Sequence, residues 1–260
     1  VASARRRTLL EDQPALATVD PRLRARLEAP AGLDLGARGA EEVAAAIVAR
    51  LVQDLRDATR PVWAIVPAAG AGRRMGGGKP LLSDGRETLV GRAVRLTEAV
   101  CDGTIVVTGS EAARVAKAVG SSARVVHAER WRDGLAASLA AGLHVLPAGT
   151  RALVVLPDMP GVDAAHLDQL RAAAARPVGE VAGAASVHPD GRLGAPALLP
   201  DDLVARGREG LGSAGDAGFA AALQGREDLR RVPLAEAFDL DTPEQAARHG
   251  WAPRTPDPAR

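Results

Sequence analysis

The stretch VWAIVPAAGAGRRMGGGK, residues 62–79, joins a short apolar run to a loop rich in glycine and basic residues. Residues 62–67 have the length and the Val and Ile content of a buried strand. The loop that follows combines five glycines with two arginines and Lys79. Glycine allows a close approach of backbone N–H groups to an anion, and basic side chains add positive charge. The stretch therefore predicts a phosphate-binding loop directly after a strand, although a solvated basic turn has the same composition.

The rest of residues 61–250 alternates between apolar runs bounded by Gly or Pro and segments of helical periodicity. We expect further strands at 103–109, 123–128, 151–160, 180–187, 194–200 and 229–234. We expect helices at 87–100, 110–119, 134–146, 163–175 and 217–223, and a last one after DLDTPE. This alternation predicts an α/β fold with a doubly wound, mostly parallel, Rossmann-like sheet. Ligands of such folds bind beyond the carboxyl ends of the strands, where the glycine loop lies.

Composition narrows the function classes. The 260 residues carry a net charge of +1 and include two Phe, three Trp and no Tyr, which argues against a nucleic-acid partner. Cys101 is the single cysteine, so a disulfide framework and a cysteine zinc site are excluded and a reducing, cytoplasmic compartment is expected. No apolar run approaches the ~20 residues of a membrane helix, so we expect no membrane partner.

Two acidic segments are candidate metal ligands. Asp158, in LPDMP, follows the expected fourth strand, and its carboxylate should face the same crevice as the glycine loop. A carboxylate is a hard ligand that suits Mg²⁺. Asp239 and Asp241, in FDLDTPE, precede a helix start marked by Pro243. Asp241 is therefore either a second metal ligand or only the cap of that helix.

Six motifs together resemble a known family. AAGAGRRMGGGKPLL, DGLAASLAAGL, LPDMP, GRLGAPALL, GDAGFAAAL and DLDTPE occur in the order and spacing of the MobA-like NTP transferases, above all of their molybdenum cofactor cytidylyltransferase branch. The resemblance spans about residues 62–249. It implies transfer of CMP from CTP to the terminal phosphate of the molybdopterin cofactor, with release of pyrophosphate.

The resemblance also implies roles for individual residues. Nucleotide binding falls on Ala68, Ala69, Gly70, Gly72, Arg74, Lys79 and Asp158. Arg74 and Lys79 would hold the phosphates, and with Asp158 they would form the catalytic set. Asp158 and Asp241 would hold Mg²⁺. At Ala69 the guanylyltransferase branch usually has Gly, which favours CTP here. Because the attacking phosphate is already ionised, positioning and electrostatics would carry the catalysis without a general base.

Two positions depart from the family pattern. Ala136 stands where the family has Gly, and Ala195 stands where the family has the histidine of GHP. Both are expected on the acceptor side of the site, so they affect the identity of the acceptor more than that of the NTP. Three alternatives therefore stay open: a nucleotidyltransferase for another phosphorylated small molecule, a non-catalytic molybdenum cofactor chaperone, or a flavin-dependent reductase on the same fold.

Residues 1–60 differ from the rest. Val43, Ile47, Leu51 and Leu55 recur every four residues and predict an amphipathic helix. The segment RLEAPAGLDLGARGAEEVAAAIVARLV resembles the end of XdhC-like accessory factors for xanthine dehydrogenase, which implies a molybdenum hydroxylase as a further partner. We expect a remnant of an XdhC-like domain over 1–60, the NTP transferase domain over 61–250 and a disordered tail over 251–260.

Overall fold

A computed structural model describes residues 32, 33, 35–37, 39–174, 182–209, 217–236 and 238–253. They belong to two units, one comprising the described residues up to Arg60 and the other those from Pro61 onward. Most of the XdhC-like segment before the first helix lies outside the described residues. The same is true of Gly215 and Asp216 of the GDAGFAAAL motif, and of the expected tail beyond residue 253.

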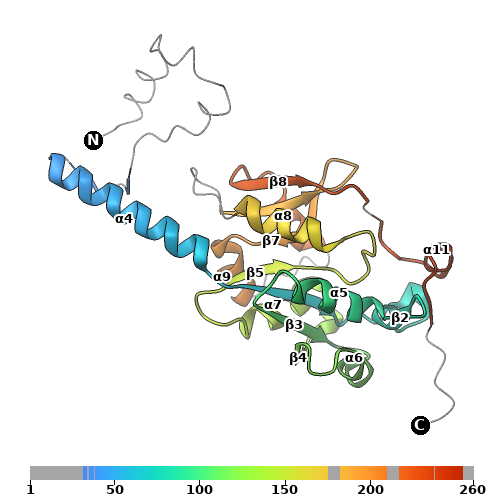
Figure 1. Cartoon of the computed structure of the whole chain (residues 1–260). Helices are drawn as coiled ribbons and strands as arrows, with labels where there is room; N and C mark the ends of the chain where they lie inside the picture. Colours follow the sequence, from blue (N-terminus) through green and yellow to red (C-terminus); the bar gives the residue numbers. More distant parts are fainter. Residues whose placement is uncertain are drawn as a thin grey trace. The chain divides into compact units, whose positions relative to one another are not determined.

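The first unit contains the predicted amphipathic helix, α4, which spans Ala40–Thr59 (Figure 1). Glu41 and Glu42 occupy its first turn, where the helix dipole favours acidic side chains. Just before the helix, Leu33 N–H donates a hydrogen bond to the carbonyl oxygen of Ala46 at 3.0 Å. The chain therefore folds back onto α4 in its second turn.

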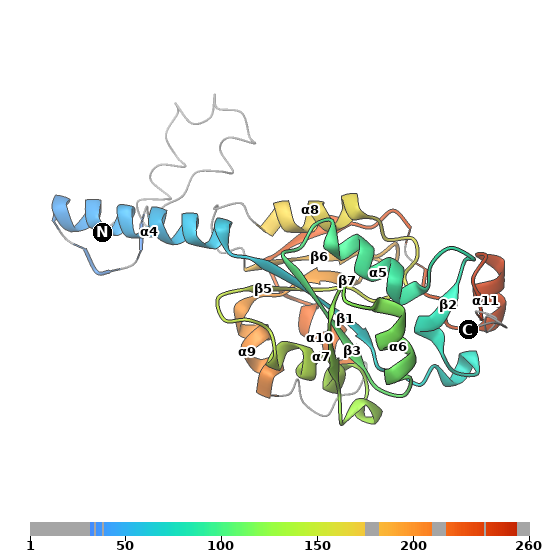
Figure 2. The same ribbon diagram turned by 60° about the horizontal axis from the view of Figure 1, so that its bottom comes forward.

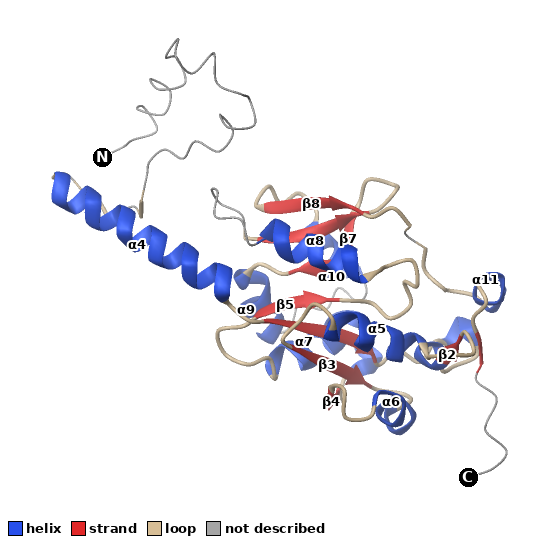
Figure 3. Cartoon of the chain, viewed as in Figure 1, coloured by secondary structure: helices blue, strands red, loops and turns tan. Residues whose placement is uncertain are grey.

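The second unit is built on one mixed sheet, whose strands Figure 3 shows in red. Among the described residues, seven strands form it in the order β4–β3–β1–β5–β7–β6–β8. These strands are β1 Val62–Ala68, β3 Gly103–Thr108, β4 Arg124–His127, β5 Arg151–Val154, β6 Gly183–Val187, β7 Leu193–Leu198 and β8 Leu229–Pro233. The pairs of β1 with β3 and with β5 are parallel, so the carboxyl ends of β1 and β5 lie side by side.

Helices cover both faces of this sheet (Figure 2). One face carries α5 Leu89–Glu98, α6 Ala112–Val119 and α8 Ala164–Ala174. The other carries α7 Leu135–His144, α9 Asp201–Glu209 and α10 Ala217–Leu223. The core between these layers consists of aliphatic side chains such as Ile65, Leu139 and Leu153, all fully buried. A chain with so few aromatic residues thus closes its core with Ala, Val, Leu and Ile.

Three features of the second unit were not predicted. Strand β7 runs antiparallel to both of its neighbours, β5 and β6, because only a turn separates β6 from β7 and a hairpin forces opposite directions. Helix α9 was missed because its sequence, DDLVARGRE, is short and mostly polar. A small second sheet pairs β2 Leu82–Ser83 with β9 Ala252–Pro253, and α11 Pro243–Arg248 precedes β9. The expected disordered tail is therefore wrong for residues 251–253, because Trp251 is buried and the two residues after it pair with β2.

An ion-pair network should make stability depend on acid pH. Arg226 binds Asp202 through two hydrogen bonds of 2.7 and 2.9 Å and also binds Asp228, which lowers the pKa of both carboxyls. Carboxyls whose pKa is lowered by folding stabilise the protein above their unfolded pKa of about 3.9, and this stabilisation is lost as the pH falls through the folded pKa.

We therefore expect Arg226→Met to reduce the free energy of unfolding at pH 7 by about 1 kcal/mol, since the pairs are partly exposed. The difference from wild type should shrink by pH 3. Urea unfolding at both pH values measures it, and an equal difference at pH 7 and pH 3 would contradict the assignment.

Candidate active site

A cavity of about 650 Å³ opens at the carboxyl ends of β1 and β5. Its size fits a small-molecule site. One wall is the glycine loop, and the floor carries acidic side chains after β5 and before α11. Residues from the sequence prediction that line it are Ala68, Ala69, Gly70, Gly72, Arg74, Lys79, Asp158 and Asp241. The fold thus gathers every predicted site residue around one cavity.

The glycine loop continues β1 and holds two short 3₁₀ turns, η1 Arg73–Met75 and η2 Lys79–Leu81. Positive φ angles occur at Gly72, Gly76, Gly77 and Gly78, which is why the loop needs this residue type. The loop also needs space at Gly72, where an added Cβ would lie 3.0 Å from the Cβ of Lys79. Arg74 is exposed at the rim of the cavity, with Arg73 beside it.

Lys79 joins the loop to the acidic floor. Its Nζ lies 2.6 Å from Asp158 Oδ2 and 2.9 Å from Asp241 Oδ1. The exposed fractions of these side chains are 17% for Lys79, 24% for Asp158 and 49% for Asp241. Burial alone would lower the pKa of the Lys79 amine, but the two carboxylates raise it above its usual value. The amine therefore stays charged and is available to neutralise phosphate oxygens.

Asp158 has a second oxygen that suits a metal ion. Its Oδ1 is buried and has no hydrogen-bond partner among the described residues. Leaving a buried carboxylate oxygen unpaired is costly, and a cation bound to it would remove that cost. No group of three His, Cys, Asp or Glu side chains in the described part of the chain is arranged as a complete metal site. The donor set fits Mg²⁺, which binds proteins through one or two carboxylates and keeps waters and phosphates as its other ligands.

The alternative role of Asp241 as a helix cap is wrong. The cap of α11 is Thr242, whose side chain accepts from Gln245 N–H while the Gln245 side chain accepts from Thr242 N–H in return. The Asp241 carboxylate is left to pair with Lys79. Leu240 N–H also donates to the backbone carbonyl oxygen of Asp158 at 3.1 Å, which fixes this segment against the end of β5.

Asp239 is a cavity residue that the sequence analysis did not assign a role. The protein atoms around it, and then the neighbouring carboxylates of Asp158 and Asp241, raise the pKa of its carboxyl. The only signal in the sequence was its place in the DLDTPE motif. Leu240 between the two aspartates is fully buried in a small apolar cluster that also holds Leu82 and Trp251. This cluster anchors both acidic side chains below the glycine loop.

Another wall of the cavity comes from the segment after β4. Trp131 lies on it, and the guanidinium of Arg132 stacks over the indole ring at 4.4 Å. Leu135 and Ser138, from the first turns of α7, complete this wall. The wall therefore carries a cation, the guanidinium of Arg132, which covers the indole ring of Trp131 beside the cavity.

The two departures from the family pattern are buried side chains. Ala136, in α7, and Ala195, in β7, are 3% and 4% exposed and are not among the residues that line the cavity. At β7, His188 Nε2 lies 2.9 Å from the carbonyl oxygen of Ala195, and its ring lies so close to Gly194 that an added Cβ there would be 2.7 Å away. A histidine from the neighbouring strand end therefore packs against this segment.

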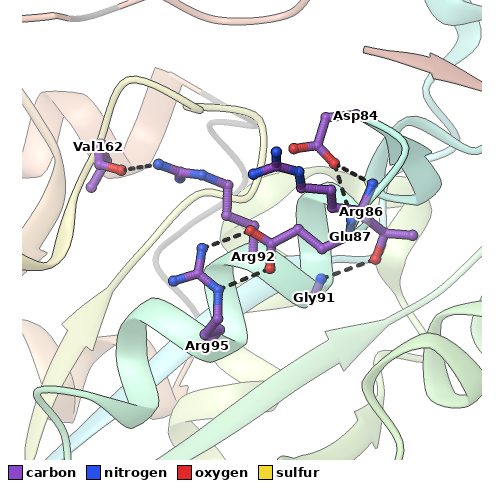
Figure 4. A network of polar contacts seen from close by, with 8 residues as sticks. Asp84, Arg86, Glu87, Gly91, Arg92, Arg95 and Val162 are labelled. Carbon is purple, nitrogen blue, oxygen red and sulfur yellow. Dashed lines mark hydrogen bonds and ion pairs between the residues drawn. The ribbon is translucent and has the colours of Figure 1, made fainter. Parts of the chain in front are cut away.

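Polar contacts order the segment before α5 and join α5 to the loop after β5 (Figure 4). The Asp84 carboxylate accepts hydrogen bonds from the backbone N–H groups of Arg86 and Glu87. The Glu87 carboxylate forms an ion pair with Arg95 of α5 at 2.6 Å. On the same helix, Arg92 Nη2 donates to the carbonyl oxygen of Val162 at 2.7 Å. Because Val162 closes the turn that begins after the end of β5, Arg92 ties the acidic side of the cavity to α5.

A single added methyl group should disturb the site at Gly109. A Cβ on this residue would lie 2.5 Å from the carbonyl oxygen of Ala69 and 2.7 Å from Trp131 Cγ. Gly109→Ala must therefore push the start of the glycine loop away from Trp131. We expect a loss of about 1–3 kcal/mol in the free energy of unfolding and a higher KM for NTP. Urea unfolding and steady-state kinetics measure these effects, and wild-type values for both would contradict this packing.

Comparison with known proteins identifies the family. A sequence profile of the MobA-like NTP transferase domain matches residues 64–229, which is more than half of the chain. The chain belongs to the MobA-like NTP transferase family. It is thus a nucleotidyltransferase of this family. No curated protein is similar enough in sequence to be matched.

Solved structures confirm the predicted α/β fold. The Rv0371c protein of Mycobacterium tuberculosis H37Rv is 23% identical with a TM-score of 0.61, over 73% of this chain and 97% of that one. Its complex with manganese is 22% identical with a TM-score of 0.60, over 73% and 97%. A nucleotidyl transferase from Methanothermobacter is 24% identical with a TM-score of 0.58, over 73% and 95%.

The sequence predicts no helix that is long and apolar enough to cross a membrane. Within the part of the chain that the structure describes, every helix is too short or too polar to span a bilayer. The resemblance of residues 1–60 to XdhC-like factors stays a prediction, because the family match begins at residue 64.

Proposed function

We propose that the protein transfers CMP from CTP to the terminal phosphate of the molybdopterin cofactor and releases pyrophosphate. The observation that supports this most is the position of Lys79, which lies at the end of the glycine loop and reaches Asp158 and Asp241 in the same cavity. Nucleotidyl transfer needs a cation, a loop that can bind phosphates, such as the glycine loop, and a carboxylate with an unpaired oxygen. The family match supports the reaction class.

The residues of the chain have separate tasks in this reaction. The backbone from Ala68 to Gly72 lines the nucleotide site, and Arg74 and Lys79 offset the negative charge of the phosphates. Asp158 and Asp241 would hold Mg²⁺, which when bound supplies Lewis-acid stabilisation of the reacting phosphate oxygens. The acceptor phosphate is already ionised, so these groups need only align the reactants and offset charge.

The nucleobase of the NTP and the identity of the acceptor are inferred from two different walls of the cavity. Ala69 is buried at the inner end of the glycine loop, and the resemblance to the cytidylyltransferase branch at this position supports CTP. Arg132, stacked on Trp131, lines another wall of the cavity, where its guanidinium suits the phosphate of an acceptor such as the molybdopterin cofactor. We further propose that residues 1–60 are an XdhC-like remnant and that 61–250 form the catalytic domain, and that a molybdenum hydroxylase is a partner.

One experiment separates this function from its alternatives. The protein is incubated with Mg²⁺ and each of the four NTPs in turn, once with molybdopterin cofactor and once with other phosphorylated small molecules as the acceptor, and pyrophosphate is measured. Release with CTP is the expected result. Release only with another phosphorylated acceptor would replace the proposed acceptor, and tight cofactor binding without release would indicate a chaperone. A yellow protein with bound flavin would indicate the reductase.

A further inference from the structure

The two candidate metal ligands already share a cation that belongs to the protein. Lys79 Nζ lies within 3 Å of Asp158 Oδ2 and Asp241 Oδ1, at 2.6 and 2.9 Å. A divalent cation held by the same two carboxylates would sit within a few ångströms of this ammonium group. Like charges at that spacing repel strongly where solvent is partly excluded. The amine and the metal ion therefore compete for the same carboxylates.

The cavity offers the Lys79 amine a second set of partners. Lys79 is the first residue of η2 and follows Gly76, Gly77 and Gly78. It lines the cavity together with the rest of the glycine loop. The two residues after it, Pro80 and Leu81, are buried and fix the backbone at this point. A lysine has a flexible four-carbon stem and a compact charge, so its amine can change partners while the backbone stays in place. Triphosphate oxygens in the cavity would be its new partners.

We propose that Lys79 is an internal counter-ion that couples metal binding to nucleotide binding by moving from Asp158 and Asp241 to the triphosphate. This inference rests on the proposed function, because it requires an NTP in the cavity. The triphosphate draws the amine away and frees the carboxylates for the metal ion. The metal ion, in turn, repels the amine towards the phosphates. By linkage, each ligand must strengthen the binding of the other by the same factor.

The coupling predicts weak metal binding by the protein alone. Without a triphosphate, a metal ion on the free Oδ1 of Asp158 must bind beside the ammonium group of Lys79, which already neutralises both carboxylates. With a triphosphate, the amine regains charged partners and the carboxylates gain the metal. We expect the coupling to be about tenfold or more, within the usual range for linked sites.

The chain is well suited to a direct test, because its two lysines are Lys79 and Lys117. Mn²⁺ alone is titrated into the full-length protein, and free Mn²⁺ is followed by electron paramagnetic resonance. Lys79→Met should bind Mn²⁺ about tenfold or more tightly than wild type, since the carboxylates lose their internal cation. Lys79→Arg should bind as weakly as wild type. The matched control is Lys117→Met, on the exposed side of α6, which should not change binding.

A second measurement needs no change at Lys79. Wild-type protein labelled with ¹³C at lysine Cε gives two lysine signals, and Lys117→Met assigns them. Adding Mg²⁺ with inorganic tripolyphosphate should move the Lys79 signal and leave the Lys117 signal in place. The tripolyphosphate probe carries no base, so this result is independent of which NTP is the substrate.

Two results would overturn the inference: Lys79→Met binding Mn²⁺ no more tightly than wild type, or an unmoved Lys79 signal with Mg²⁺ and tripolyphosphate both present. Circular dichroism melting of Lys79→Met checks that its fold is retained, and the labelled wild-type protein decides the matter if it is not. Failure of the proposed function looks different, because it is the absence of pyrophosphate release in the wild-type protein.

Discussion

Asp158→Asn should reduce pyrophosphate release by roughly 10³-fold, because a metal ligand contributes several kcal/mol of charge stabilisation and each 1.36 kcal/mol is tenfold in rate. Asn keeps the shape of the side chain but removes the charge at the end of β5. The buried Oδ1, which has no partner among the described residues, is the atom that we assign to the metal. Steady-state assays with CTP and Mg²⁺ measure the loss.

The same variant should retain its fold. Lys79 keeps Asp241 as an ion-pair partner at 2.9 Å, so no charge is left fully unpaired in Asp158→Asn. The melting temperature of Asp158→Asn should therefore be nearly unchanged, whereas its Mn²⁺ binding should be lost. Asp168→Asn, on the exposed face of α8, is the matched control and should retain wild-type activity. More than a tenth of wild-type activity in Asp158→Asn would contradict the role of Asp158 as a metal ligand.

Lys79→Met should reduce kcat/KM for the NTP by about 10²–10³-fold, the range seen when one donor to a developing negative charge is removed. Its amine is held charged by Asp158 and Asp241, so in the wild-type protein it brings a full positive charge to the phosphates. Met preserves most of the stem that packs near Gly72. Single-turnover kinetics separate the loss in binding from the loss in the chemical step.

Lys79→Met and Lys117→Met together make this prediction specific. Both remove one positive charge from the chain, but only Lys79 lines the cavity. Loss of activity in both variants would point to a general effect of net charge. Near wild-type activity in Lys79→Met would mean that the glycine loop binds phosphate without its lysine, and the proposed mechanism would then lose its main cation.

Much of the site was predictable from the order of the elements. Apolar runs placed a strand before the glycine loop and another before Asp158, and two parallel neighbouring strands end at the same edge of a sheet. The structure pairs β1 with β5 in this way, so loop and carboxylate meet. The polar segment of α9 was not predictable, because packing in the folded unit, rather than periodicity in the sequence, determines it. The direction of β7 was missed, although the short turn between β6 and β7 indicates a hairpin.

The contacts of Lys79 were beyond sequence reasoning. Its partner Asp241 is 162 positions away, and no local pattern reports a side-chain contact at that separation. The same holds for Asp239, whose proximity to Asp158 depends on the hydrogen bond from Leu240 N–H to the backbone carbonyl oxygen of Asp158. Ala136 and Ala195 could be recognised as departures, but that both are buried rather than exposed in the cavity followed only from the fold.

Transfer of an isotopic label from CTP is the most direct test of the account. The protein is given Mg²⁺, molybdopterin cofactor and CTP labelled with ³²P at either the α- or the γ-phosphorus, and the products are separated. The account predicts α-label in the cofactor product and γ-label in pyrophosphate. Appearance of γ-label in the cofactor or in free phosphate, or no transfer of α-label from any NTP, would contradict it.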